Sequence, residues 1–299
     1  MKYIFALVVL RFIDLFGGIG GFRLGLEKAN QRFRCVWYCD NNKYAVQVYN
    51  KKFKENYMPT DIREVETRSI PDFDLLCAGF PCQSFSVAGK RKGFKDTRGN
   101  MFFEIARIAK QKQPRILFLE NVKGLLSHDK GKTFAVILNT LDELGYDCEW
   151  QVLNSKDFGV PQNRERVFII GYFRGTSRPK VFPIRCDAGE VSKISRIGTC
   201  QPEHPNNYNV FAIDGVSPTL SSAGDGHWGQ SILPFCKACG SIRRLTPVEC
   251  ERLQSFPDNW TRYGTDENGE TVEISDTQRY RMCGNAVTCN VVEAIGNLV

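Results

Sequence analysis

Cys82 is the residue best placed for covalent chemistry in this sequence. It lies in segment 79–86, Gly-Phe-Pro-Cys-Gln-Ser-Phe-Ser, directly after the apolar run 75–78, which we predict to be a buried strand. Cys82 is therefore expected on a loop at the ligand-binding edge of a parallel sheet. A thiolate is strongly nucleophilic, and the positive charges of Lys90 and Arg91 would favour that form. A single cysteine is more often a small core residue, but the Pro-Cys-Gln setting at a strand end favours a nucleophile.

A carboxyl group and two guanidinium groups are expected at the same edge. Glu120 ends the apolar run 116–119, and a partly buried glutamic acid there could donate a proton to a ring nitrogen if the substrate is a pyrimidine. Arg164 and Arg166 stand one residue apart at the start of another strand, so both point the same way and could clamp a carboxylate, a phosphate or a base edge. The ordinary alternatives are a glutamate that caps the next helix and arginines that are solvated at the surface.

A glycine-rich turn, residues 17–21, separates the first apolar strand from a helical stretch and is typical of a nucleotide site. It matches Gly-x-Gly-x-x-Gly only loosely. Asp40 follows about 20 residues later at a strand end, where it could accept hydrogen bonds from a ribose. This pattern does not distinguish a nicotinamide dinucleotide from S-adenosylmethionine, because both contain an adenosine ribose. Asp61 is a second acidic candidate, suited to an adenine amino group or simply solvated, and the turn alone could exist without a ligand.

Short apolar strands alternate with helices up to about residue 172, which predicts an α/β fold with a doubly wound, mostly parallel sheet. The following segment is rich in Gly, Pro, Ser and Asn and predicts a smaller, loop-rich unit with short strands. Helical character returns at 247–255 and 286–297. We expect a catalytic, cofactor-binding domain at 1–175, completed by 280–299, and a small domain with its hinge at 176–279. The predicted strands are 11–16, 35–39, 75–78, 116–120 and 166–172, and the predicted helices between them are 22–29, 44–52, 101–110 and 133–144.

Composition sets broad limits on the protein's class. The 299 residues are 42% apolar and 24% charged, as in an ordinary globular protein, and the net charge of +7 is compatible with a polyanionic partner without establishing one. The apolar start, MKYIFALVVL, is too short for a bilayer, which needs about 20 such residues, and no cleavage site follows it. Twelve cysteines without an export signal predict reduced thiols, so we expect a cytoplasmic protein that does not enter a membrane.

Six segments in one order make the chain resemble the C5-cytosine DNA methyltransferases, especially the short bacterial restriction–modification type. The resemblance covers nearly the whole chain, and each piece alone is weak to moderate. It extends over 12–22, 79–83, 120–122, 162–166, 244–257 and 284–287.

This resemblance implies roles for individual residues. Cys82 would attack carbon 6 of a cytosine swung out of the duplex, and Glu120 would act as the acid on nitrogen 3. Arg164 and Arg166 would hold the flipped base and the active-site loop. A methyl group would pass from S-adenosylmethionine to carbon 5, leaving S-adenosylhomocysteine, while the base that removes the carbon-5 proton is a water or an unassigned side chain. The implied cofactor-binding residues are Phe16, Gly18, Gly20, Gly21, Asp40, Asn41, Asp61, Ile62, Pro81, Asn285 and Ala286.

This sequence departs from the family pattern at one cofactor position, and it contains the segment that varies among family members. The family usually stacks an aromatic side chain on adenine next to the ribose-binding acid, and Asn41 stands at that position here. The segment between the arginine pair and Arg244 corresponds to the target-recognition region, where 218–221 resembles the family's Thr-Leu signature and 224–229 could enter a groove. Its shortness predicts a short target sequence. The candidate DNA contacts are Gln83, Ser86, Lys90, Arg91, Thr219, Leu220, His227 and Arg244.

The expected partner is double-stranded DNA, and a cognate restriction endonuclease could act on the same site without forming a stable complex. We expect a monomer. The alternatives are a tRNA cytosine-5 methyltransferase on the same scaffold, a catalytically inactive DNA-binding relative and, least favoured, a nicotinamide-dependent oxidoreductase. The Cys236-Lys-Ala-Cys239 pair, with other cysteines and His204 nearby in sequence, matches no familiar zinc-finger spacing, so we predict no metal.

Overall fold

The computed structural model describes residues 9–81, 101–184, 196–199, 209–212, 216–220, 233–236, 241–242 and 244–299. The strands at 196–199, 209–212, 233–236 and 241–242 are described by their backbone alone. Several residues singled out in the sequence therefore lie outside the described part of the chain: Cys82, Gln83, Ser86, Lys90, Arg91, His204, His227 and Cys239.

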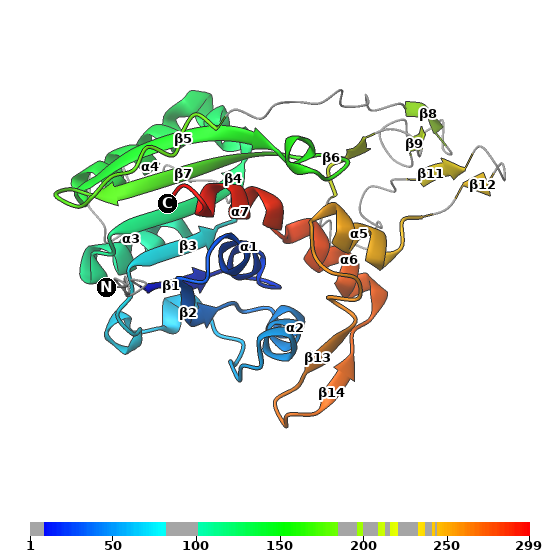
Figure 1. The fold of residues 1–299 in the computed structure, drawn as a ribbon, viewed down its shortest axis with the longest axis horizontal. Coiled ribbons are helices and arrows are strands. Elements are labelled where there is room, and N and C mark those ends of the chain that lie inside the picture. Colours follow the sequence, from blue (N-terminus) through cyan, green and yellow to red (C-terminus); the bar gives the residue numbers. More distant parts are fainter. Residues whose placement is uncertain are drawn as a thin grey trace, which may run out of the picture.

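The centre of the fold is a six-stranded sheet in the order β2-β1-β3-β4-β7-β5 (Figure 1). Its first four strands run parallel, and β7 is antiparallel to both of its neighbours, β4 and β5. This arrangement confirms the predicted mostly parallel α/β sheet. The strands are β1 (Leu10–Leu15), β2 (Phe33–Cys39), β3 (Leu75–Gly79), β4 (Ile116–Val122), β5 (Tyr146–Asn154) and β7 (Glu165–Phe173).

Alternating side chains of the central strands enter two separate cores, one on each face of the sheet. In β4, Leu117 and Leu119 pack against helices α3 (Met101–Lys112) and α4 (Lys132–Glu143). Ile116 and Phe118 pack on the opposite face with α1 (Gly21–Ala29) and α7 (Cys289–Gly296). Strands buried on both faces read as continuous apolar runs, which is why the sequence reveals them.

The last helix, α7, packs against the first helix, α1. The close approach depends on Gly25, since a Cβ atom there would lie 2.6 Å from Val292 Cβ and 2.7 Å from the Cys289 carbonyl oxygen. Figure 1 shows both helices on one face of the sheet, although they lie at opposite ends of the chain. Side chains of α1 and α7 therefore belong to the same core.

Two elements of the main unit were not expected, β5 and α6 (Asp276–Asn285). β5 is an edge strand with one neighbour, so most of its residues are only partly buried and it lacks a long apolar run. α6 is mostly polar, with Met282 and Cys283 as its buried apolar side chains. Periodicity of apolar residues gives a weak signal in both cases.

The remaining strands are short. The strands β8 (Arg196–Thr199), β9 (Asn209–Ala212), β11 (Leu233–Cys236) and β12 (Ser241–Ile242) form a separate sheet in the order β12-β11-β9-β8. β10 (Ser217–Pro218) instead pairs with β6 (Gln162–Asn163), which joins the later segment to the main unit. The hairpin of β13 (Tyr263–Thr265) and β14 (Thr271–Glu273) follows α5 (Pro247–Leu253) and lies beside α2 (Lys43–Phe53).

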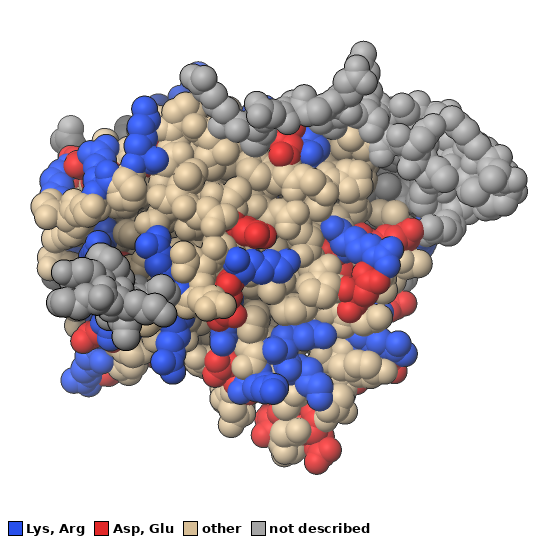
Figure 2. All heavy atoms as spheres, viewed as in Figure 1, with Lys and Arg blue, Asp and Glu red and all other residues tan. Residues whose placement is uncertain are grey.

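Part of segment 176–279 shares a core with the first helices. Phe256, Trp260 and Ile274 pack together with Ile19 and Val48. On the face shown in Figure 2, basic side chains gather over α2, and acidic side chains are interspersed with basic ones elsewhere. The net charge of +7 therefore does not by itself identify a binding face. None of the helices in the described ranges is long and apolar enough to cross a membrane.

Gly25→Ala is expected to destabilise the fold. Alanine favours a helix over glycine by about 1 kcal/mol, but the added methyl group would overlap the α7 backbone, at a cost of about 1–3 kcal/mol. Urea unfolding should show a lower free energy of unfolding than in the wild-type protein. Gly124→Ala is the control, because a Cβ atom there has no neighbour within 4 Å. A Gly25 variant as stable as the wild type would contradict the close α1–α7 contact.

Candidate active site

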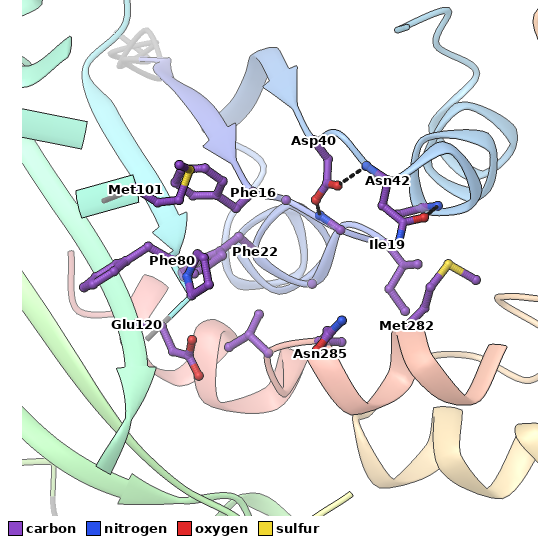
Figure 3. Close-up of a pocket in the computed structure, with 18 of the residues that line it drawn as sticks. Phe16, Ile19, Phe22, Asp40, Asn42, Phe80, Met101, Glu120, Met282 and Asn285 are labelled. Atoms are coloured by element: carbon purple, nitrogen blue, oxygen red, sulfur yellow. Dashed lines mark hydrogen bonds between the residues drawn. The ribbon is translucent and has the colours of Figure 1, made fainter. Parts of the chain in front are cut away.

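A cavity of about 910 Å³ lies at the carboxyl ends of the parallel strands. Its walls come from the residues that follow β1, β2, β3 and β4, and from the end of α6 (Figure 3). Figure 3 shows Phe16, Ile19 and Asp40 on the side of the first two strands, Glu120 at the end of β4, and Asn285 on α6. Ligands of open α/β sheets bind at this edge.

The glycine turn after β1 is held in place by two side chains from β2. The Asp40 carboxylate accepts hydrogen bonds from the backbone N–H groups of Gly18, at 2.9 Å, and Asn42, at 2.8 Å. The Tyr38 hydroxyl donates to the Gly18 carbonyl oxygen at 2.8 Å. Gly18 has a φ of 54°, which favours glycine, and a Cβ atom there would find no atom within 4 Å. The turn thus presents open backbone to the cavity.

Asp40 has spare capacity for a ligand. Burial raises the pKa of its carboxyl, while hydrogen bonds from backbone N–H groups of Asn42, Gly18 and Asn41 act in the opposite direction. Each oxygen accepts one of the hydrogen bonds described above and retains a second lone pair. Such a carboxylate can accept bonds from neighbouring hydroxyl groups, as a ribose would provide.

Asp14 lies beneath the same turn, and sequence analysis did not select it. It is fully buried, neither carboxyl oxygen has a hydrogen-bond partner, and burial raises its pKa to about 8. Gly17 separates it from Tyr38, since a Cβ atom on Gly17 would lie 2.7 Å from Asp14 Cγ and 2.8 Å from the tyrosine ring. The only sequence signal was an aspartate within a mostly apolar strand.

Apolar side chains line the cavity between Asp40 and Glu120. Phe16, Ile62, Phe80 and Met101 provide this surface, and Asn41 is exposed on the same wall. Asp61, by contrast, forms an ion pair with Arg63, whose hydrogen bonds lower the pKa of the Asp61 carboxyl. All of the predicted cofactor residues except Gly20 line the cavity. Gly20 instead faces the ring of Phe53.

Glu120 and Arg166 form a largely buried ion pair at the other end of the cavity. The Arg166 Nε atom lies 3.0 Å from Glu120 Oε1. Burial raises the pKa of Glu120, and the charges of Arg166 and Arg164 partly oppose that shift. Antiparallel pairing places Arg166 opposite Val122, two residues beyond Glu120 on the neighbouring strand. The glutamic acid can therefore retain a proton at a higher pH than an exposed glutamic acid would.

Arg164 binds backbone carbonyl groups. Its guanidinium donates to the carbonyl oxygens of Leu220, Gly284 and Ala286 at 3.2, 3.0 and 2.8 Å. Burial, followed by the neighbouring charge of Arg166, lowers the pKa of Arg164 to about 9. Its hydrogen bonds fasten segments that lie far apart in the sequence.

The stem of the Cys82 segment is also fixed. Buried Asn121 donates from its side-chain amide to the Phe80 carbonyl oxygen at 2.9 Å, and the adjacent Pro81 is exposed on the cavity wall. Glu120 lies beside this stem, because its Oε2 atom would be 3.4 Å from a Cβ atom on Gly79. The structure thus brings the predicted acid next to the strand that leads to the predicted nucleophile.

Three predicted DNA contacts lie in the described chain. Thr219 and Leu220 line the cavity; the Thr219 hydroxyl donates to the Asn163 carbonyl oxygen at 2.6 Å, and the Leu220 side chain is buried. Arg244 does not line the cavity. Sequence analysis missed several lining residues, some of them adjacent to its candidates and others recognisable only after folding: Ile19, Asn42, Thr60, Met101, Arg281 and Met282.

Asp14→Asn is expected to stabilise the protein at neutral pH. Because the folded-state pKa is raised, the contribution of this carboxyl to stability is fully present below the unfolded value of 3.8 and is lost as the pH rises towards about 8. At pH 7 the neutral amide should raise the unfolding free energy by roughly 2–4 kcal/mol. Urea titrations between pH 5 and 8 would measure this difference. Exposed Asp72→Asn is the control, and equal pH dependence in Asp14→Asn and wild type would rule out the raised pKa.

Comparison with known proteins extends these observations over most of the chain. The family model of the C-5 cytosine-specific DNA methylases matches residues 10–214 and 237–299. The Type II methyltransferase M.HhaI of Haemophilus parahaemolyticus is 36% identical, with 96% of this chain and 93% of the relative covered. M.NgoBI of Neisseria gonorrhoeae is 40% identical, with coverages of 94% and 90%.

Solved structures share the fold at lower identity. The Dnmt2 methyltransferase of S. pombe aligns with a TM-score of 0.72 at 21% identity, over 95% of this chain and 96% of the other. The methyltransferase EhMeth of Entamoeba histolytica aligns with a TM-score of 0.65 at 19% identity, over 96% of each chain. Together with the family match, these results show that the chain belongs to the C-5 cytosine-specific DNA methylase family and is an enzyme that methylates carbon 5 of cytosine in DNA from an S-adenosylmethionine-type donor.

Proposed function

We propose that one cavity holds both reactants, with S-adenosylmethionine at the glycine turn and a flipped cytosine between Cys82 and Glu120. The observation that carries this proposal is the continuity of the cavity, which is lined by Asp40 and Gly18 at one end and by Glu120 at the other. A methyl donor and an acceptor ring bound in one cavity need no transfer through solvent.

The residues at the turn suit the donor. Asp40 has lone pairs free for the ribose hydroxyls, and the open space at Gly18 lets the ligand approach the backbone. Phe16, Ile62 and Met101 offer an apolar surface to the adenine. With Asn41 at the position where the family usually has an aromatic, that apolar surface carries more of the adenine contact in this proposal. The bound donor supplies an electrophilic methyl group.

The proposed chemistry on cytosine assigns one task to each side chain. Protonated Glu120 donates a hydrogen bond to nitrogen 3, which makes carbon 6 more electrophilic. Cys82 directly follows Pro81, which lines the cavity. Its thiolate adds to carbon 6, and carbon 5 then becomes nucleophilic enough to accept the methyl group. Loss of the carbon-5 proton to a base, a water or an unassigned side chain, then allows the thiolate to leave.

The two arginines have different proposed tasks. Arg166 positions the Glu120 carboxyl through its Nε atom, which lies 3.0 Å from Oε1 and can donate to that oxygen also when the acid is protonated, and it contributes to holding the base. Arg164 positions the cavity wall, since its two terminal nitrogens donate to the carbonyl oxygens of Leu220, Gly284 and Ala286. Arg164 thus contributes to base binding through the backbone that it fixes.

Target recognition is proposed for the smaller unit within 176–279. It has its own four-stranded sheet, and the family model leaves residues 215–236 unmatched, which suits a segment that differs with the target sequence. The proposed DNA contacts remain Gln83, Ser86, Lys90, Arg91, Thr219, Leu220, His227 and Arg244. Since the relatives are Type II methyltransferases, we propose that this enzyme acts as a cytoplasmic monomer alongside a restriction endonuclease of the same specificity.

Cys82→Ser should lower methylation of duplex DNA by about a thousandfold or more, because a hydroxyl is a far weaker nucleophile. Binding of S-adenosylhomocysteine should be unchanged. Cys39→Ser is the matched control, because this buried thiol also lines the cavity. With DNA containing 5-fluorocytosine, wild type and the Cys39 variant should form a covalent adduct and the Cys82 variant should not. Adduct formation by Cys82→Ser would refute the assignment, and parallel reactions with tRNA test the alternative substrate.

Glu120→Gln should reduce the single-turnover rate by about a hundredfold and leave the affinity for S-adenosylhomocysteine unchanged. In the wild type, activity requires the protonated acid, so its rate should fall as the pH rises through the raised pKa of Glu120. The Gln variant should lack this decline. Glu165→Gln is the control, because that glutamate pairs with Lys123 at the surface. Identical pH profiles in Glu120→Gln and wild type would exclude Glu120 as the acid.

A further inference from the structure

Arg281 is a cation on the cavity wall with no anionic partner among the described residues. Three other arginines also line this cavity. Arg63 and Arg166 are each paired with a carboxylate, and Arg164 donates to three carbonyl oxygens. Within the same described ranges, Arg281 makes neither a hydrogen bond nor an ion pair, and its side chain is exposed. The cavity therefore contains a positive charge that no described residue neutralises.

The position of Arg281 links it to the glycine turn. Arg281 and Asn285 are four residues apart on α6, so they share a helix face, and both line the cavity. Met282, the next residue, is buried against Ile19 of the turn, and Figure 3 shows these two side chains close together. Arg281 is thus placed on the wall beside the point where the turn enters α1.

The start of α1 adds positive potential at this corner. No side chain caps the helix at Gly20, and its first turn contains no acidic residue. The N–H groups of a first helical turn lack partners within the helix and carry partial positive charge. Asp40, the nearby acid of the turn, already accepts two backbone hydrogen bonds. An anionic group would therefore be favoured between the start of α1 and Arg281.

We propose that Arg281 binds the carboxylate of the methionine part of the methyl donor, an inference that rests on the proposed function. The donor's adenosine end is assigned to Asp40 and the apolar wall, which leaves its amino-acid end for the side of the cavity formed by α6. Its carboxylate is the only anionic group of the donor. A DNA phosphate could also pair with an exposed arginine, but the shared wall with Asn285 and the contact of Met282 with Ile19 favour a ligand held at the turn.

Two related ligands separate the contribution of the amino-acid end, which bears the carboxylate, from that of the adenosine. S-adenosylhomocysteine contains it, whereas 5′-methylthioadenosine lacks the whole amino-acid end and retains the adenosine. Titration calorimetry on the full-length protein should show that Arg281→Ala binds S-adenosylhomocysteine about 5- to 20-fold more weakly. Its affinity for methylthioadenosine should match that of the wild type. Arg281→Lys should recover part of the lost affinity, because it restores the charge.

Arg63→Ala is the matched control, because Arg63 is another exposed arginine of the cavity that already has a carboxylate partner. This substitution should not weaken the binding of S-adenosylhomocysteine relative to that of methylthioadenosine. The proposal is overturned if Arg281→Ala changes the affinities for both ligands equally or changes neither. Weaker binding of duplex DNA alone, with a reduced salt dependence, would assign Arg281 to a phosphate instead. If the wild-type protein bound neither ligand, the proposed donor site itself would fail, which is a distinct outcome.

Discussion

The buried guanidinium of Arg164 is the interaction on which the shape of the cavity depends. It donates to carbonyl oxygens of Leu220, Gly284 and Ala286, which belong to segments more than fifty residues away in the sequence. Desolvating a guanidinium is costly, and these hydrogen bonds offset that cost. The same contacts place the end of α6 opposite the strand ends, so donor and acceptor regions become walls of one cavity.

The sequence predicted the main sheet and much of the cavity because both depend on local signals. Apolar runs marked the central strands, and polar or glycine-rich residues directly after them marked the binding edge. Asp40, Glu120 and Pro81 all lie where a parallel sheet places the residues that follow its strands. β5 and α6 were not predicted, because an edge strand and a polar helix bury too few side chains to give a clear periodicity of apolar residues.

Other features of the site could not be predicted, because they depend on distant partners. The sequence suggested that Arg164 clamps a carboxylate, a phosphate or a base edge, and only the fold reveals its carbonyl partners. Asp14 looked like part of a strand, and its charge state depends on complete burial beneath the turn. Arg281 stood in a polar helix with no motif of its own. Its significance comes from what surrounds it and from the absence of a partner among the described residues.

Residues 217–220 attach the smaller unit to the main unit largely through their peptide groups. β10 pairs with β6 through the backbone, the Leu220 carbonyl accepts from Arg164, and the Asn163 carbonyl accepts from Thr219. The strand pairing does not depend on side-chain identity, whereas the other two contacts require the Arg164 guanidinium and the Thr219 hydroxyl. Substitutions elsewhere in the segment therefore leave this junction intact, as long as both of these donors are kept.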